Sequence, residues 1–365
     1  MSVAGQAPAY IRSIMPYQPG KPISELAREM GIPEASIVKL ASNENPLGMS
    51  AAAREAARRA LCEGARYPDG SAFAFKAALC RKFGVRHEQL VVGNGSNDVL
   101  EIAAQAFLAP GLSAVFAQHA FAVYPLATNA RGARGIEVPA RNFGHDLDAM
   151  AAAIAPDTRI VFIANPNNPT GTFLPGMEIE AFLKEVPTDV LVVLDEAYTE
   201  YLADDQRYDS IAWLERFPNL LVSRTLSKAY GLAGLRVGYA IAHPDVADLM
   251  NRVRQPFNVS NIALAAAEAV LADDEFLARS AEINGRGMVQ ITEAFAAMGL
   301  EWIPSAGNFV TVKVGDAAKV NQALLRQGVI VRPIAGYGMP QWLRVSIGLP
   351  EENARFIAAL KQALA

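Results

Sequence analysis

The sequence predicts an α/β protein built around a largely parallel β-sheet, with a smaller α+β region toward its C-terminus. Short apolar runs bounded by Gly, Pro or Asn alternate with longer amphipathic segments, which is the pattern of repeated βα units. Some of these runs, such as VLVVL at 190–194, are apolar at every position, as expected of a strand covered by helices on both faces. A chain of 365 residues is long enough for one large and one small domain.

The strands of the large sheet are expected at 114–117, 160–164, 190–194, 220–223 and 237–241. From about residue 261, Ala-rich helical sequence leads into a second pattern, in which strands expected at 309–314, 329–333 and 342–347 alternate with helices, the last beginning near Pro350. Segments rich in Pro and Gly near the start indicate an extended arm. We therefore expect an N-terminal arm at 1–40, a large domain at 41–285 and a small domain at 286–365.

Composition excludes several classes of function. The 33 basic and 37 acidic residues leave a net charge of −4, so no basic surface for a nucleic acid is expected. Cys62 and Cys80 lack CxxC spacing and a nearby His cluster, which argues against a disulfide framework and a metal site. The first residues resemble no signal peptide, and no window holds roughly 18 apolar residues in a row. We expect a cytoplasmic protein without a membrane partner.

Three short segments at or just after expected strands carry the chemistry: NPNNPTG at 165–171, LDEAY at 194–198 and SRTLSK at 223–228. Their order and spacing predict a site for pyridoxal phosphate. This cofactor requires a lysine amine, a carboxylate facing its pyridine nitrogen, donors to its ring hydroxyl and a cradle for its phosphate. Small and hydroxyl neighbours could leave the amine of Lys228 desolvated, with a lowered pKa. Considered alone, Lys228 would instead be an ordinary solvated lysine.

Each remaining group around the ring has a structural alternative. Asp195 ends an apolar strand, so its carboxylate emerges at the carboxyl edge of the sheet, where α/β proteins bind ligands, although it could also cap the next helix. Tyr198 follows three residues later and could reach the same ring, or pack in the core. Asn168 offers an amide at the same edge, unless its segment is a plain loop.

The phosphate is expected at the start of a helix. The GNGSN segment at 93–97 precedes a helical run, so its backbone N–H groups and the Ser96 hydroxyl could hold an anion. A helix N-terminus stabilises an anion by only about 0.3 to 2 kcal/mol. We therefore expect further hydrogen bonds to the phosphate from Thr225, Ser227 and Arg236. Such bonds are stronger when the donor or the acceptor carries a charge.

With these motifs the chain resembles, over nearly its full length, the fold-type I pyridoxal-phosphate enzymes of the class I/II aminotransferases. The segments IRSIMPYQPGKPISELAREMG, KLASNENPLG, RYPDG and WLRVSIG make it similar, more narrowly, to the histidinol-phosphate aminotransferase family. The resemblance implies transfer of an amino group between histidinol phosphate and 2-oxoglutarate, a step of histidine biosynthesis. It also implies a homodimer with shared active sites.

The resemblance assigns roles by position. It makes Lys228 the lysine that binds the cofactor covalently, Asp195 the partner of the ring nitrogen, and Tyr198 and Asn168 the donors to the ring hydroxyl. The other residues implied around the cofactor are Phe121, Gly95, Ser96, Asn97, Thr225, Ser227 and Arg236, with Tyr67 reaching the phosphate of the neighbouring subunit. Phe121 stands where the family often has a tyrosine, which keeps ring stacking but removes a hydroxyl. Ser96-Asn97-Asp98 replaces the Ser-Asp-Glu of many members.

The two substrates must share one pocket, although one carries an α-carboxylate where the other carries a phosphate ester. The guanidinium of Arg344 can pair with either anion through two hydrogen bonds, unless Arg344 is a surface residue on an edge strand. Tyr17 and Arg332 are further candidates for closing over the substrate, and the resemblance adds Asn45 as a substrate contact.

Three other functions remain open from the sequence. An aromatic amino-acid aminotransferase would use the same cofactor residues with another side-chain pocket. A pyridoxal-phosphate-dependent decarboxylase of a phosphorylated amino acid would release CO₂ instead of consuming an oxo acid. A cofactor-sensing regulator would carry an added basic DNA-binding segment, and none precedes residue 40.

Overall fold

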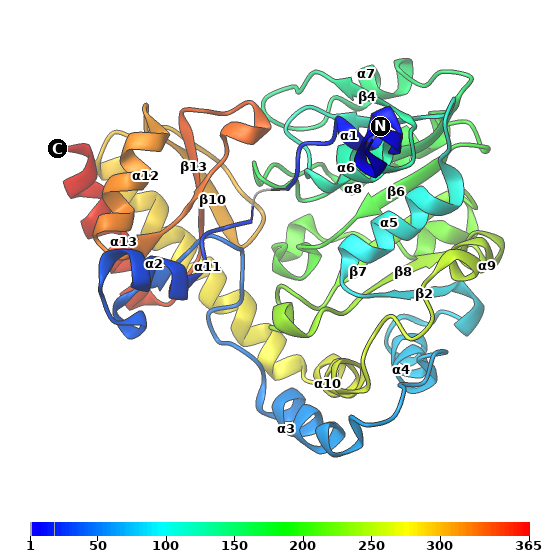
Figure 1. Cartoon of the computed structure of the whole chain (residues 1–365), viewed down its shortest axis with the longest axis horizontal. Helices are drawn as coiled ribbons and strands as arrows, with labels where there is room; N and C mark the ends of the chain where they lie inside the picture. Colours follow the sequence, from blue (N-terminus) through cyan, green and yellow to red (C-terminus); the bar gives the residue numbers. More distant parts are fainter. Residues whose placement is uncertain (1, 18) are drawn as a thin grey trace.

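The computed structural model describes residues 2–17 and 19–365; Met1 and Gln18, both within the expected arm, lie outside the described residues. Two bodies lie side by side (Figure 1). The larger contains a seven-stranded sheet, here called the large sheet, and the smaller contains a four-stranded sheet, here called the small sheet. The fold is the α/β arrangement that the sequence predicts.

The large sheet has the strand order β2-β8-β7-β6-β5-β3-β4. Its strands are β2 (Leu90–Gly93), β3 (Ser113–Ala117), β4 (Arg134–Val138), β5 (Thr158–Ala164), β6 (Leu191–Asp195), β7 (Leu220–Thr225) and β8 (Gly238–Ala242). All neighbours are parallel except β8, which is antiparallel to both β2 and β7. The expected strands are confirmed to within two residues, whereas β2 and β4 were not expected. The edge strand β4 is mostly exposed, so it lacks the continuous apolar run that marks a central strand.

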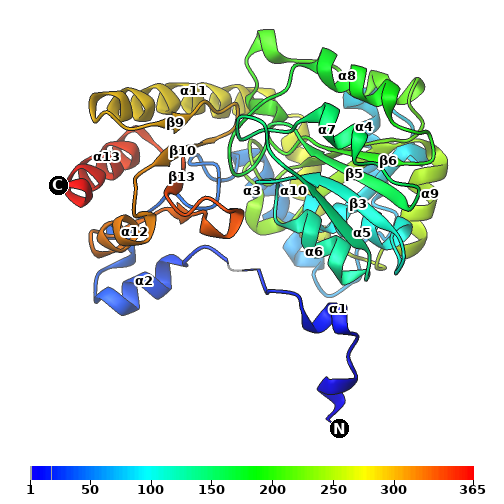
Figure 2. The same ribbon diagram turned by 90° about the horizontal axis from the view of Figure 1, so that it is seen from above.

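Helices cover both faces of the large sheet. In Figure 2, α5 (Ser96–Phe107) and α6 (Val123–Ala130) lie on one face, while α7 (Leu147–Ala152) and α8 (Gly176–Glu185) lie on the other. This double cover explains why β3 and β6 are buried at every position. The remaining helices of this body are α3 (Ala51–Ala60), α4 (Phe73–Phe83), α9 (Pro244–Val253) and α10 (Asn261–Leu271).

The small sheet has the order β12-β13-β10-β9 and is antiparallel throughout. Its strands are β9 (Trp302–Ile303), β10 (Phe309–Lys313), β12 (Arg332–Pro333) and β13 (Trp342–Ser346), and its helices are α11 (Asp274–Ala297), α12 (Ala317–Arg326) and α13 (Pro350–Leu364). Its core is separate from that of the large sheet and includes Phe295, Leu343 and Phe356.

The single strand expected at 329–333 is wrong, because two short strands occupy this segment. β11 (Val329–Ile330) pairs in parallel with β1 (Val38–Lys39) near the N-terminus, while β12 pairs with β13 of the small sheet. The apolar run is continuous in sequence, but its backbone hydrogen bonds go to β1 before Val331 and to β13 after it.

The N-terminal segment connects the two bodies. It begins with α1 (Ala9–Arg12) beside α6 and continues to α2 (Ile23–Met30) beside the small body, as Figure 2 shows. Short 3₁₀ turns occur at Val3–Gln6, Glu34–Ser36, Leu61–Glu63, His87–Gln89, Thr199–Tyr201, Asp204–Gln206, Ala212–Glu215, Ala233–Leu235 and Ala335–Tyr337. The chain between α1 and α2 therefore passes from one body to the other.

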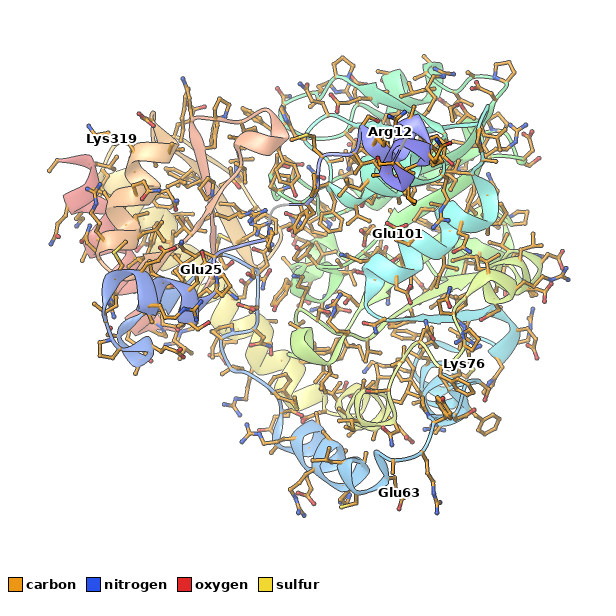
Figure 3. All side chains as sticks on the ribbon, viewed as in Figure 1. Arg12, Glu25, Glu63, Lys76, Glu101 and Lys319 are labelled. Carbon is orange, nitrogen blue, oxygen red and sulfur yellow. The ribbon has the colours of Figure 1, made fainter. Side chains whose placement is uncertain are left out.

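Charged side chains lie mainly around the outside of both bodies. Lys319, at the upper left of Figure 3, and Glu63, at the bottom, are both exposed. Within residues 2–17 and 19–365, no helix has the length and apolar character that crossing a bilayer requires.

The carboxyl ends of the central strands are level with one another. Ala164 at the end of β5 pairs with Asp195 at the end of β6, and Asp195 pairs with Ser223 on β7. The three motifs that follow these strands therefore emerge together at one edge of the large sheet, as expected from its parallel order.

Candidate active site

A cavity of about 190 Å³ lies at this edge of the large sheet. Its walls also include residues of the small sheet and of the N-terminal segment. The predicted residues that line it are Tyr17, Ser96, Asn97, Phe121, Asn168, Asp195, Tyr198, Thr225, Ser227, Lys228, Arg236, Arg332 and Arg344. Segments that are far apart in the sequence thus converge on one site.

Lys228 follows β7 and is half-buried in the cavity wall. Its Nζ donates a 3.2 Å hydrogen bond to the backbone oxygen of Ser42 and lies 5.8 Å from the centre of the Tyr198 ring. Burial, together with the charge of Arg344, lowers the pKa of Lys228 from 10.5 to about 8. About a tenth of these amines are uncharged at pH 7, a far larger fraction than for a solvated lysine. The alternative of an ordinary solvated lysine is wrong.

Asp195 is 5% exposed, and its two carboxylate oxygens differ. Oδ2 accepts a 2.9 Å hydrogen bond from the hydroxyl of Tyr124, whereas Oδ1 has no partner among the described residues. Burial raises the pKa of Asp195 to about 6, a shift that the Tyr124 hydrogen bond opposes. A buried carboxylate oxygen without a hydrogen-bond partner lowers the stability of the folded protein, unless a ligand supplies that partner.

Tyr198 is positioned by a residue that the sequence did not single out. Its hydroxyl accepts a 2.9 Å hydrogen bond from the side-chain amide of Asn43, and burial raises its pKa to about 12, so it remains protonated near neutral pH. Asn43 has a left-handed backbone (φ 53°), which Asn adopts more readily than most residues. It also bonds Ser346 and Asn308 of the small body. The N-terminal segment, the small body and Tyr198 therefore meet at one asparagine.

Arg344 lies on β13, between β10 and β12, and is 7% exposed, so the alternative of a surface residue on an edge strand is wrong. One guanidinium nitrogen donates to Oδ1 of Asn168 at 2.6 Å, and another donates to the backbone oxygen of Ala41 at 2.7 Å. Its Nε is buried without a partner in the described part of the chain. The Arg332 guanidinium lies 5.6 Å from the centre of the half-exposed Tyr17 ring.

The expected phosphate cradle has the required shape. α5 begins at Ser96 without a side-chain cap, which leaves its first N–H groups available. Arg236 donates to the Ser227 hydroxyl at 3.3 Å, and Ser227 N–H donates to Thr225 Oγ1 at 3.1 Å. Gly95 (φ 84°) does not line the cavity itself, but a Cβ there would collide with the Arg236 guanidinium. Glycine is therefore required for Arg236 to approach the helix start.

Besides Gly95, two further predicted residues do not line the cavity. Asn45, predicted as a substrate contact, does not line the cavity, and its side-chain amide donates to Ala229 O and Ser280 Oγ, both at 2.8 Å. Tyr67 is 83% exposed and stacks on Phe257 at the surface, with ring centres 4.9 Å apart. It has no role in this chain's own cavity.

The cavity fits pyridoxal phosphate on its own chemistry. Lys228 provides a partly uncharged amine, Asp195 an unpartnered oxygen for a protonated ring nitrogen, and Tyr198 a protonated hydroxyl. The uncapped start of α5 together with Arg236 provides an anion site. Asn43 and Tyr124 are the functional residues missed by the sequence analysis. The available signals were the NENP segment, which begins at Asn43, and the helical spacing of Tyr124 from Phe121.

Comparison with known families agrees with this arrangement. Residues 35–360 match the model of the family described as aminotransferase class I and II. The chain belongs to this class.

Its relatives narrow the assignment to the histidinol-phosphate aminotransferase family. Histidinol-phosphate aminotransferase 2 of Ralstonia nicotianae is 65% identical, with 98% of this chain and 97% of the relative covered. Histidinol-phosphate aminotransferase 1 of Dechloromonas aromatica is 64% identical over the whole of both chains. A crystal structure of histidinol-phosphate aminotransferase from Sinorhizobium meliloti in complex with pyridoxal-5′-phosphate is similar with a TM-score of 0.90 at 29% identity, covering 98% and 97% of the two chains.

Proposed function

We propose that this chain is a pyridoxal-phosphate-dependent transaminase that interconverts histidinol phosphate and 2-oxoglutarate with imidazole acetol phosphate and glutamate. The observation that carries the proposal is the cavity in which Lys228, Asp195 and Arg344 meet. Relatives that are about 65% identical over their full lengths and carry the name histidinol-phosphate aminotransferase support the choice of substrate.

Bound pyridoxal phosphate supplies a carbonyl carbon that takes up the amino group and a ring that withdraws electrons from the substrate Cα. Lys228 supplies the base. Because burial lowers its pKa to about 8, its Nζ can accept the proton that the substrate loses at Cα and can later return it. The second substrate uses the same group in the reverse direction.

Asp195, Tyr198 and Asn168 would hold the ring of the bound cofactor. The free Oδ1 of Asp195 would keep the ring nitrogen protonated, while the Tyr198 hydroxyl and the Asn168 amide would donate to the ring hydroxyl and Phe121 would stack on the ring. The phosphate would be held by Ser96, Asn97, Thr225, Ser227 and Arg236, since the start of α5 and the Arg236 guanidinium both favour negative charge.

Arg344 binds the anionic group that differs between the substrates. Burial lowers its pKa, but a guanidinium stays charged at working pH, and Nε is buried without a partner in residues 2–17 and 19–365. Arg332 adds a second positive charge, and Tyr17 covers the substrate from the N-terminal segment. A carboxylate and a phosphate ester are both accepted because each can take two parallel hydrogen bonds from a guanidinium.

We infer a cytoplasmic homodimer with an arm at 1–40, a large domain at 41–285 and a small domain at 286–365. The separate hydrophobic cores support the division, and the unpaired Cys62 and Cys80 suit a reducing compartment. In this dimer Tyr67 would reach the phosphate of the partner's cofactor, and its exposure at the surface beside Phe257 supports that role. Sedimentation equilibrium of the purified protein tests the dimer, which a monomeric mass would contradict.

The substrate is tested by steady-state kcat/KM values for histidinol phosphate and phenylalanine, each with 2-oxoglutarate. We expect a preference for histidinol phosphate of about a hundredfold or more, equivalent to about 2.7 kcal/mol in transition-state binding. Equal or reversed preference would instead indicate an aromatic amino-acid aminotransferase. Release of CO₂ without consumption of an oxo acid would indicate a decarboxylase.

A further inference from the structure

The carboxylate of Asp195 is held by a residue outside the three motifs. Tyr124 lies on α6 and does not line the cavity. Its hydroxyl donates a 2.9 Å hydrogen bond to Oδ2 and leaves Oδ1 without a partner in the described chain. The two oxygens of one carboxylate are therefore divided between a fixed internal donor and the cavity.

The Tyr124 ring cannot easily move. The residue is fully buried, and its ring stacks on Phe162 of β5 with centres 4.7 Å apart and planes 7° apart. Phe121 packs edge-on against it at 5.9 Å, and the two residues are joined by a backbone hydrogen bond at the start of α6. The ring expected over the cofactor and the hydroxyl that holds Asp195 are thus parts of one rigid turn.

The hydroxyl also affects the charge on Asp195. Burial raises the pKa of Asp195, and the neighbouring Glu196 carboxylate raises it further; the Tyr124 hydroxyl, the Ala197 N–H and the charge of Lys228 lower it. The hydroxyl of Tyr198 also interacts with Asp195. Among the described residues, Tyr124 is the one side chain of this set that hydrogen-bonds the carboxylate, and the Ala197 N–H is a backbone donor to it. Burial and the Asp195 carboxylate hold the pKa of Tyr124 well above its usual value of 10, so its hydroxyl stays protonated near neutral pH and can donate to Asp195.

We propose that Tyr124 is a positioning residue of the reaction: its hydroxyl orients Asp195 and keeps it ionised, so that Oδ1 can hold the proton on the cofactor's ring nitrogen. This inference rests on the proposed cofactor and reaction. Without the hydroxyl, Asp195 binds its own proton more tightly and is free to rotate, and the ring withdraws electrons less strongly.

Tyr124→Phe tests this role because it removes the hydroxyl and keeps the ring between Phe162 and Phe121. Tyr239→Phe is the matched control, since Tyr239 on β8 is also fully buried but makes no hydrogen bond to Asp195 in the described structure. The primary readout is the pH titration of the visible absorbance of the cofactor-loaded protein. Loss of positive charge on the ring nitrogen raises the proton affinity at the Lys228 nitrogen, so we expect the midpoint to rise by about one pH unit.

Steady-state kinetics distinguish an effect on the orientation of Asp195 from an effect on substrate binding. We expect kcat of Tyr124→Phe to fall about 10- to 100-fold with KM changed less than about threefold, because the effect is on the chemical step. Tyr239→Phe should match the wild type in both readouts. A Tyr124→Phe protein whose midpoint and kcat equal those of the control would overturn the proposal and leave only a packing role.

A second variant covers the case in which Tyr124→Phe does not fold. 3-Fluorotyrosine at position 124 keeps the ring and the hydroxyl but makes the hydroxyl a stronger donor, so the absorbance midpoint should move down. An unchanged midpoint, or one that moves up, contradicts the proposal. A wild-type protein that fails to bind the cofactor would count against the proposed function instead, since that result does not depend on Tyr124.

Discussion

The two sides of the cavity are built in different ways. On the cofactor side, Asn168, Asp195 and Lys228 follow adjacent strands of one buried sheet and are fixed by its register. On the substrate side, Tyr17, Arg332 and Arg344 come from the N-terminal segment and the small sheet. Asn168 and Asp195 on the cofactor side are 9% and 5% exposed, whereas Tyr17 on the substrate side is 51% exposed.

This difference in construction separates the residues that carry out the reaction from the residues that select the substrate. Groups at the ends of parallel strands cannot shift without disturbing the hydrogen bonds of the sheet, which suits proton transfer. Groups on separate segments can change position when those segments move, which suits a pocket that must accept two unlike substrates. Arg344, whose guanidinium bonds Asn168, is the direct link between the two sides.

The largest effect is expected on the cofactor side. Lys228→Ala removes the base, and we expect turnover to fall at least about a thousandfold while the protein stays folded. The visible absorbance of the bound cofactor should also change. Steady-state rates and absorbance spectra check this, with Lys184→Ala at the exposed end of α8 as the control. Turnover at the wild-type rate would remove Lys228 from the mechanism.

An intermediate effect is expected at the link between the sides. Arg344→Lys keeps a positive charge but loses the paired hydrogen bonds, each worth about 1.5 to 3 kcal/mol for a charged group. We expect kcat/KM to fall about 10- to 100-fold for both glutamate and histidinol phosphate, mainly through KM. The exposed Arg286→Lys serves as the control. If only one substrate is affected, Arg344 is not the shared anion site.

The smallest effect is expected at the N-terminal segment. Tyr17→Ala removes the ring that lies beside the Arg332 guanidinium, a contact worth about 0.5 to 1 kcal/mol at an exposed site. KM should rise about two- to fivefold with kcat unchanged. Met15→Ala, exposed on the same segment, controls for general disturbance. A loss of kcat comparable to that of Lys228→Ala would mean that the two sides are not separable.

The sequence predicts a site residue well when that residue stands at or just after the end of a buried strand. Asp195 and Lys228 could be predicted because each is preceded by an apolar run, and the end of that run places the residue at the carboxyl edge of the sheet. Asn43 and Tyr124 could not, because their partners lie 155 and 71 residues away and depend on tertiary packing. In the same way, the sequence shows that the NENP segment reaches the site but not which of its side chains bonds a site residue: Asn43 bonds Tyr198, whereas Asn45 bonds Ala229 and Ser280.

The pairing of β1 with β11 has a consequence for synthesis on the ribosome. Val38 emerges early, but its partner Val329 is made near the end of the chain. At about 5 to 20 residues per second, β1 remains without its partner for roughly 15 to 60 seconds. The strands of the large sheet are complete well before then. We therefore expect the large sheet to assemble first and the beginning of the chain to be among the last parts to find its place.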